Sequence, residues 1–223
     1  MEKISVEKII SGVDARKIIL NCLLDGPKTG SEIRWALADS FDRRIDGVSD
    51  TLLYFNLQHL ENNEIITRTK EWKLKYSEIL PDKIQSIRKF FHKIVPITIV
   101  GGIEEEPNVI RSLRNRLRIE KSITPPEKYI FLGPEQLRRK VAGFFPDVKL
   151  IYVKPDTFFR NPKELYELVK TEILDPEIKK NEVIMDVTSG SRICSLALLN
   201  LAYEYGLRCI YLDENEKLIW ILD

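Results

Sequence analysis

The chain has 223 residues, of which 43% are hydrophobic and 31% charged, which is enough for one large or two small domains, each with its own core. The 35 Lys and Arg balance 34 Asp and Glu, and the formal net charge of +1 means that any affinity for nucleic acid must come from a local patch. Cys22, Cys194 and Cys209 have no Cys-x-x-Cys spacing and no neighbouring His. This pattern supports neither a disulfide framework nor a zinc site, and we expect no metal and no cofactor.

Two further features of the sequence limit the classes of protein to which the chain can belong. The longest uncharged, mainly apolar run, residues 94–103, is about half the length of a membrane span, and the first eleven residues lack a signal-peptide core. We therefore expect a cytoplasmic protein with no membrane partner. The two histidines, His59 and His92, both fall in the first part, so a His-based catalytic centre in the second part is excluded.

Residues 1–80 are predicted to form helices followed by a hairpin. Apolar residues recur at helical spacing over residues 6–24, with an interruption near Gly12, and a capping box from Thr29 to Glu32 opens a second helix. Ser49 can cap a third helix that has Leu53, Leu57 and Leu60 on one face. Residues 65–68 and 73–76 alternate as two strands around Glu71 and Trp72. This order predicts an α+β winged helix-turn-helix domain.

The same stretch resembles a known family. Residues 26–33 (GPKTGSEI), then residues 49–54, Leu57, residues 60–62, Ile65, Ile66 and a basic wing, look like winged-helix transcription regulators of the PadR and ArsR type over about residues 10–80. The resemblance implies that the third helix enters the major groove of double-stranded DNA while the wing contacts the backbone. Residues 65–93 hold 8 basic and 3 acidic side chains. The expected DNA contacts are Ser49, Thr51, Phe55 and Gln58 on the helix and Arg68, Lys70, Lys73 and Lys75 on the wing.

Residues 81–95 are predicted to form a linker helix that begins at Pro81 and reaches Ile94, with an apolar stripe for its own fold or a second subunit.

From residue 96 the hydrophobic period changes. Apolar runs at 97–100, 129–132, 150–153, 183–187 and 209–212 alternate with helical segments, and residues 218–222 add a last strand. Pro107, Pro134 and Pro162 stand where first helical positions are expected, and the fourth helix begins at Ser191 or Arg192 and ends at Gly206. Apolar strands that alternate with helices predict an α/β Rossmann-like domain over residues 96–223, with a parallel sheet covered on both faces.

Ligands of such sheets bind beyond the carboxyl ends of the strands. Two loops there are small enough for close backbone approach: Gly101-Gly102, which leads to Pro107 and Asn108, and Thr188-Ser189-Gly190-Ser191 with the cation Arg192. Hydroxyls, a glycine and helix N–H groups suit a phosphate, although the small residues could instead serve only helix packing. A dinucleotide site is excluded because residues 100–106 lack Gly-x-Gly-x-x-Gly.

The segment from Glu182 to Arg192, followed by a small-residue helix and residues 207–213, resembles the signature of CARF domains, the CRISPR-associated Rossmann fold, over about residues 96–223. Where that family typically reads Asp-x-Thr-Gly-Gly-Thr-Lys, this chain has Ser189, Ser191 and Arg192 in place of Gly, Thr and Lys. The resemblance implies a homodimer that binds a cyclic oligoadenylate, the second messenger of type III CRISPR systems. The DNA-binding domain comes first here, whereas regulators of that family usually carry it last.

The sequence favours a non-enzymatic, ligand-responsive transcription regulator. Two alternatives stay open: a ring nuclease that cleaves its own cyclic ligand, and a constitutive DNA-binding protein whose second domain only dimerises it. Arg111, Arg114, Arg116 and Arg118 crowd one helix. Their pattern indicates a solvated charged face, with contact to a ligand or nucleic acid as the alternative.

Overall fold

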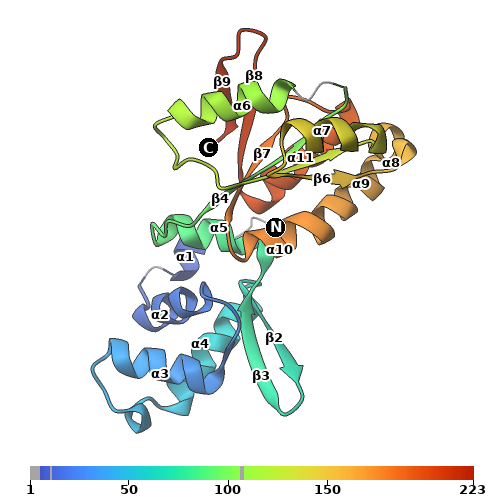
Figure 1. Cartoon of the computed structure of the whole chain (residues 1–223). Coiled ribbons are helices and arrows are strands. Elements are labelled where there is room, and N and C mark those ends of the chain that lie inside the picture. Colours follow the sequence, from blue (N-terminus) through green and yellow to red (C-terminus); the bar gives the residue numbers. More distant parts are fainter. Residues whose placement is uncertain (1–5, 11, 106–107) are drawn as a thin grey trace. The chain divides into compact units, whose positions relative to one another are not determined.

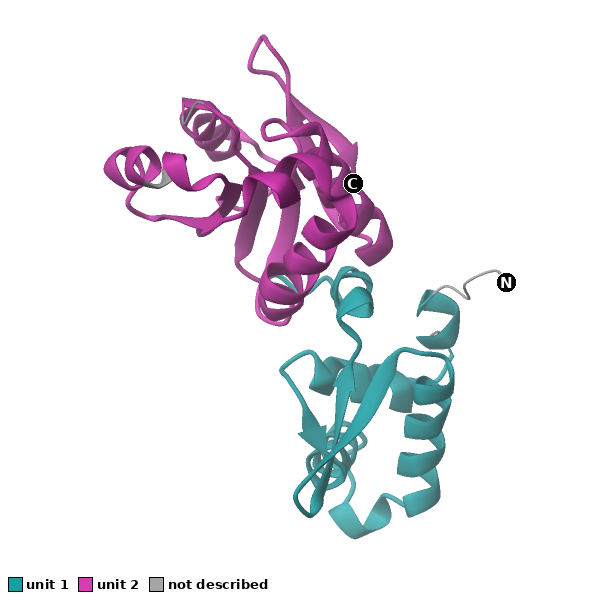
Figure 2. Cartoon of the chain, turned by 90° about the vertical axis from the view of Figure 1, so that its right-hand side faces the viewer, with its two compact units in different colours: residues 1–94 teal, residues 95–223 magenta. Residues whose placement is uncertain are grey.

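The computed structural model describes residues 6–10, 12–105 and 108–223. The chain forms two compact units, Met1–Ile94 and Val95–Asp223, shown in different colours in Figure 2. Within the described ranges, no helix combines the length and the apolar character that crossing a bilayer requires.

The first unit combines helices with a small antiparallel sheet (Figure 1). Its helices are α1 (Val6–Ile10), α2 (Asp14–Leu23), α3 (Gly30–Ser40), α4 (Asp50–Asn62) and α5 (Pro81–Phe90), with a 3-10 turn η1 (Ile45–Gly47) between α3 and α4. Its strands are β1 (Lys28–Thr29), β2 (Ile66–Glu71) and β3 (Leu74–Ile79), in the order β1-β3-β2. The core lies between the helices and the sheet and includes Ile19, Leu20, Ile33, Leu37, Leu53, Leu57, Leu60, Ile66 and Ile79.

The local signals at the helix starts are confirmed. The Thr29 hydroxyl accepts the Glu32 N–H while the Glu32 carboxylate accepts the Thr29 N–H, which is the capping box expected there. The Ser49 hydroxyl accepts the Leu52 N–H at 3.1 Å and so caps α4. These side chains satisfy N–H groups that the first helical turn leaves unpaired.

Some boundaries in this unit differ from the prediction. The two hairpin strands extend to residues 66–71 and 74–79, because cross-strand pairing continues to Glu71 opposite Leu74. The turn between them is closed by Trp72 with φ of +56°. The predicted linker helix ends at Phe90 instead of Ile94, and it buries Ile84 and Ile87 within the first unit. The two-residue strand β1, which no sequence period could reveal, pairs with β3.

The second unit is built on a six-stranded sheet. Its strands are β4 (Ile97–Gly102), β5 (Lys128–Gly133), β6 (Val148–Tyr152), β7 (Glu182–Asp186), β8 (Arg208–Leu212) and β9 (Leu218–Leu222), in the order β6-β5-β4-β7-β8-β9. The strands β4 to β8 are parallel, and β9 pairs antiparallel with β8. The predicted Rossmann-like parallel sheet is therefore confirmed for this unit.

Helices cover both faces of this sheet. The helices α6 (Asn108–Ile119) and α7 (Arg138–Phe144) pack on one face, where Ile110, Leu113, Leu117 and Val141 meet Ile99 and Phe131. On the other face α11 (Arg192–Tyr205) packs against β4 and β7, and α8 (Pro155–Arg160) and α9 (Pro162–Val169) pack against α11. A π-helical turn, η3 (Lys170–Leu174), and the short helix α10 (Asp175–Ile178) lead from α9 to β7.

The predicted starts and ends of the helices in this unit are confirmed in part. Asn161 caps α9 ahead of Pro162, Ser191 caps α11, and Gly206 ends α11 with φ of +62°, as predicted. The helix expected to begin at Pro134 was misplaced. A 3-10 turn, η2 (Glu135–Leu137), comes first, because the Leu137 N–H bonds the Pro134 carbonyl at 3.1 Å, and α7 begins only at Arg138. Val153 lies beyond the end of β6, and Pro107 lies outside the described residues.

Candidate functional site

The parallel sheet has its topological switch point between β4 and β7. The chain leaves β4 towards β5 on one side, while β7 pairs with β4 on the other. The loops that follow these two strands therefore meet at the carboxyl edge of the sheet, where α/β proteins bind ligands. This edge brings together Gly101 and Gly102 from one loop and residues 188–192 from the other.

The two glycine loops are packed against each other. A Cβ built on Gly102 would lie 2.6 Å from Cys194 Sγ and 3.1 Å from the Ser189 carbonyl oxygen, and Gly190 has φ of +98°. A Cβ built on Gly101 would lie 2.8 Å from the Phe131 ring and 2.9 Å from Asp186 Oδ2. These glycines are thus needed for the loops to pack, so their presence does not by itself indicate a ligand.

A buried carboxylate anchors the loop after β7. Asp186 Oδ1 accepts the Thr188 N–H at 3.0 Å and the Thr188 hydroxyl, and the Thr188 oxygen accepts the Leu212 N–H at 2.8 Å. This chain of hydrogen bonds ties the loop to the end of β8. Asp186 is fully buried, and its Oδ2 has no hydrogen-bond partner within the described structure. Burial raises the pKa of Asp186 from its ordinary 3.8 to about 6, and the hydrogen bonds from Thr188 oppose that rise.

The hydroxyls predicted to contact a phosphate fall into two groups. Ser191 is buried, accepts the Cys194 N–H at 3.1 Å and donates to the Phe158 carbonyl, so its hydrogen-bonding capacity serves the start of α11. Thr188 is committed to Asp186 and β8. Ser189 and Arg192, by contrast, have no hydrogen bond or ion pair to any described residue, and Arg192 is exposed. Ser189, Arg192 and the N-terminal N–H groups of α11 are the groups that this loop can offer to an anion.

The loop after β4 contributes backbone and negative charge. Ile103 is buried and its N–H bonds the Leu132 carbonyl at 2.8 Å. Glu104 is half-buried and Glu105 is exposed beside it. Asn108 is exposed at the first position of α6. Among the predicted ligand contacts of this loop, Gly101 and Gly102 are buried, and Pro107 is not described.

The second candidate surface is the exposed face of α4 in the first unit. The core side chains Leu53, Leu57 and Leu60 are fully or almost fully buried, whereas Thr51, Phe55 and Gln58 are exposed, with Phe55 64% accessible. These three predicted DNA contacts share one helix face because they are spaced four and three residues apart. Tyr54, which is not among the predicted DNA contacts, is exposed beside them. Ser49 is used as the cap of the helix.

The basic residues of the β2–β3 hairpin differ in whether their side chains are already hydrogen-bonded. Arg68 donates from Nε to Glu61 Oε2 at 2.8 Å and from Nη2 to Gln58 Oε1 at 2.7 Å, while Gln58 donates to Asn62 at 2.7 Å. The hydrogen bond from Arg68 holds the pKa of Glu61 below its ordinary value. Arg68 thus connects the β2–β3 hairpin to α4, and its guanidinium is already paired. Lys70, Lys73 and Lys75 are exposed, and Lys70 lies directly opposite Lys75 across the hairpin.

No group of three or more His, Cys, Asp or Glu side chains in the described part of the chain could hold a metal ion.

No protein-family model matches the sequence, and no curated protein matches it. Among solved structures, the chain is similar to Can2 from Sulfobacillus thermosulfidooxidans in complex with cyclic tetra-adenylate, with 19% identity and a TM-score of 0.38. It is also similar to protein VC1899 from Vibrio cholerae, with 15% identity and a TM-score of 0.44.

Each similarity covers 56% of this chain and about a third of the other protein, 34% of Can2 and 33% of VC1899. Neither of them assigns a ligand or an activity to this chain.

Proposed function

We propose that this chain is a homodimeric transcription regulator that binds double-stranded DNA through its first unit and a cyclic oligoadenylate through its Rossmann-like unit. One observation carries the DNA-binding half: α4 presents Thr51, Phe55 and Gln58 to solvent beside a hairpin with free lysines. Exposed polar and aromatic side chains on a helix can contact base edges, and lysines can contact phosphates.

The lysine pair on the hairpin strengthens this proposal. Like charges directly opposite each other on a hairpin destabilise it, and Lys70 faces Lys75 across the strands. A DNA phosphate between them would convert that repulsion into attraction. Because Arg68 is already bound to Glu61, we expect Lys70, Lys73 and Lys75 to supply the phosphate contacts, about three for each subunit.

A titration of duplex DNA tests this half. With about three phosphates neutralised per subunit, the logarithm of affinity should fall with the logarithm of salt concentration at a slope of about −0.9 for each phosphate. A shallow slope or the absence of duplex binding at low salt would refute DNA binding.

The effector half rests on the resemblance of residues 186–192 to the CARF signature and on the place of this loop at the switch point. Ser189, Arg192 and the N-terminus of α11 leave donors free at the carboxyl edge of the sheet, and such donors suit phosphate groups. Calorimetric titration with cyclic tetra- and hexa-adenylate tests this half. Absence of binding would favour the constitutive DNA-binding alternative, and the appearance of linear products would favour the ring nuclease.

A two-fold symmetric ligand and a palindromic operator both require a symmetric dimer. We therefore expect a dimer by light scattering at micromolar concentration without ligand, and a clean monomer would contradict the proposal.

A further inference from the structure

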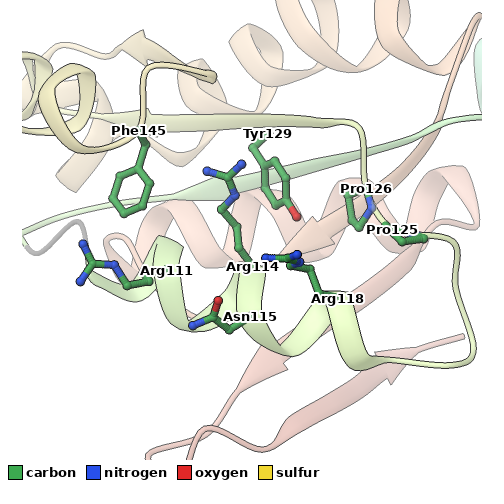
Figure 3. Close-up of a pocket in the computed structure, with 8 residues that line it drawn as sticks. All are labelled: Arg111, Arg114, Asn115, Arg118, Pro125, Pro126, Tyr129 and Phe145. Atoms are coloured by element: carbon green, nitrogen blue, oxygen red, sulfur yellow. The ribbon is translucent and has the colours of Figure 1, made fainter.

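A pocket with a volume of about 420 Å³ lies beside α6 in the second unit. Figure 3 shows arginines on successive turns of α6, with aromatic rings across from them. The pocket is lined by three arginines, one asparagine, two prolines and two aromatic rings, namely Arg111, Arg114, Asn115, Arg118, Pro125, Pro126, Tyr129 and Phe145. The volume falls within the range of about 300–1,000 Å³ that is typical of small-molecule sites.

The pocket is separate from the loops at the switch point. Tyr129 stands at the beginning of β5, and Pro125 and Pro126 precede that strand. Phe145 follows α7 and precedes β6. The pocket therefore opens near the amino-terminal ends of the parallel strands, whereas the β4 and β7 loops lie at their carboxyl ends.

The central arginine is held rigidly. Arg114 donates from Nη1 to Asp147 Oδ1 at 3.1 Å and from Nη2 to Oδ2, and its guanidinium lies 4.9 Å from the centre of the Tyr129 ring. The hydrogen bonds that Arg114 donates to Asp147 raise the pKa of Arg114. A two-pronged ion pair and a stacked ring fix the plane of a guanidinium. The guanidinium of Arg114 thus forms a flat, fixed part of the pocket lining.

The two outer arginines are left for a ligand. Arg111 and Arg118 are exposed, and neither has a hydrogen bond or ion pair to any residue that the structure describes. Arg111 lies over the Phe145 ring at 6.0 Å. With Asp147 neutralising Arg114, the pocket keeps two uncompensated positive charges. An anionic ligand would compensate these two charges, which no described side chain now does.

We propose that this pocket binds a nucleotide, with its phosphate on Arg111 and Arg118 and its base against the flat walls. Guanidinium groups bind phosphate through two parallel hydrogen bonds, and their planes also stack on bases. Asn115, exposed on the same helix, offers both a donor and an acceptor to the edge of a base. The phosphate and base can belong to a free nucleotide or to one unit of a single strand.

Titration of the full chain with adenosine 5′-monophosphate tests this proposal. Replacing both outer arginines (R111A with R118A) should weaken binding about tenfold or more, because two charge-assisted contacts are lost. The control is R116A, which removes one positive charge, against two in the double variant, from the same helix at a position that does not line the pocket. R116A should leave the affinity for the nucleotide unchanged.

Three outcomes would overturn the proposal: unchanged affinity in the double variant, an equal loss in R116A, or inorganic phosphate binding as tightly as the nucleotide. The last outcome would mean that the pocket recognises only an ion. A single-stranded oligonucleotide distinguishes the two sources. Tighter binding of the strand than of the mononucleotide, lost in the same double variant, would assign the pocket to a single strand, and the reverse order would assign it to a free nucleotide.

Discussion

Gly102 and Gly190 lie backbone to backbone at the carboxyl edge of the sheet. A Cβ built on Gly190 would come within 2.9 Å of Gly102 Cα, and one built on Gly102 would come within 3.3 Å of Gly190 Cα. The loops after β4 and β7 can approach this closely only because neither residue has a side chain. The shape of the candidate effector site therefore depends on this contact.

Replacing Gly190 with alanine should lower the free energy of unfolding. The positive φ of +98° alone disfavours a side chain, and the clash with Gly102 adds to it, so we expect a loss of about 1–3 kcal/mol. The control is Gly26→Ala, since Gly26 has φ of +115° but nothing within 4 Å of its Cβ position. Urea denaturation should show a larger loss at Gly190. An equal loss at both positions would mean that the contact with Gly102 contributes nothing.

Arg192→Ala should weaken binding of the cyclic oligoadenylate and leave stability unchanged. Arg192 is exposed and has no partner in the described structure, so its removal leaves no buried group unsatisfied. A charge-assisted hydrogen bond contributes about 1.5–3 kcal/mol, which is more than the 0.3–1 kcal/mol or so of a helix terminus. Calorimetry should therefore show about a tenfold or greater loss. Unchanged affinity would place the effector elsewhere.

Asp186 should make stability depend on pH. Its pKa rises from 3.8 to about 6 in the folded chain, so the folded state binds the proton more tightly than the unfolded state. The resulting stabilisation is present below about pH 4 and is lost as the pH rises through about 6, a change of up to about 3 kcal/mol. Asp186→Asn should flatten this part of the curve in urea denaturation. Parallel curves for both proteins would contradict the prediction.

Glu61→Gln should strengthen non-specific DNA binding. The substitution removes the ion pair between Glu61 and Arg68. The charge of Arg68 then becomes available to a DNA phosphate, and the salt slope should steepen by about one unit. Glu71→Gln is the control, because Glu71 is exposed on the same hairpin and its neutralisation changes the charge equally without releasing an arginine. If both variants change the slope alike in duplex titrations, the pairing of Arg68 is irrelevant to binding.

Gln58→Ala should reduce specific binding more than non-specific binding, by about 1–3 kcal/mol if the Gln58 amide exchanges its hydrogen bonds with Arg68 and Asn62 for a two-pronged base contact. Lys73→Ala should instead weaken all duplexes alike and make the salt slope shallower by about one unit. Competition titrations with operator and random duplexes measure both effects. An equal loss on every sequence would show that Gln58 does not read bases.

The sequence by itself determined the features that depend on neighbours within a few residues. The caps at Thr29, Ser49 and Ser191 and the left-handed end at Gly206 follow from local hydrogen bonds and backbone freedom. The change from helical periods to apolar strands at residue 96 determined the parallel sheet, because buried strands must be apolar on both faces.

Only the tertiary structure decided which polar groups are free to bind. Ser191 meets the Phe158 carbonyl across 33 positions, and Arg114 meets Asp147 across the same separation. The spacing of residues along the chain carries no information about such contacts, since they depend on how helices and strands pack. The sequence could not reveal the α6 pocket for this reason. Its arginines follow a helical pattern, but the prolines opposite them precede β5, and the rings come from β5 and from the end of α7.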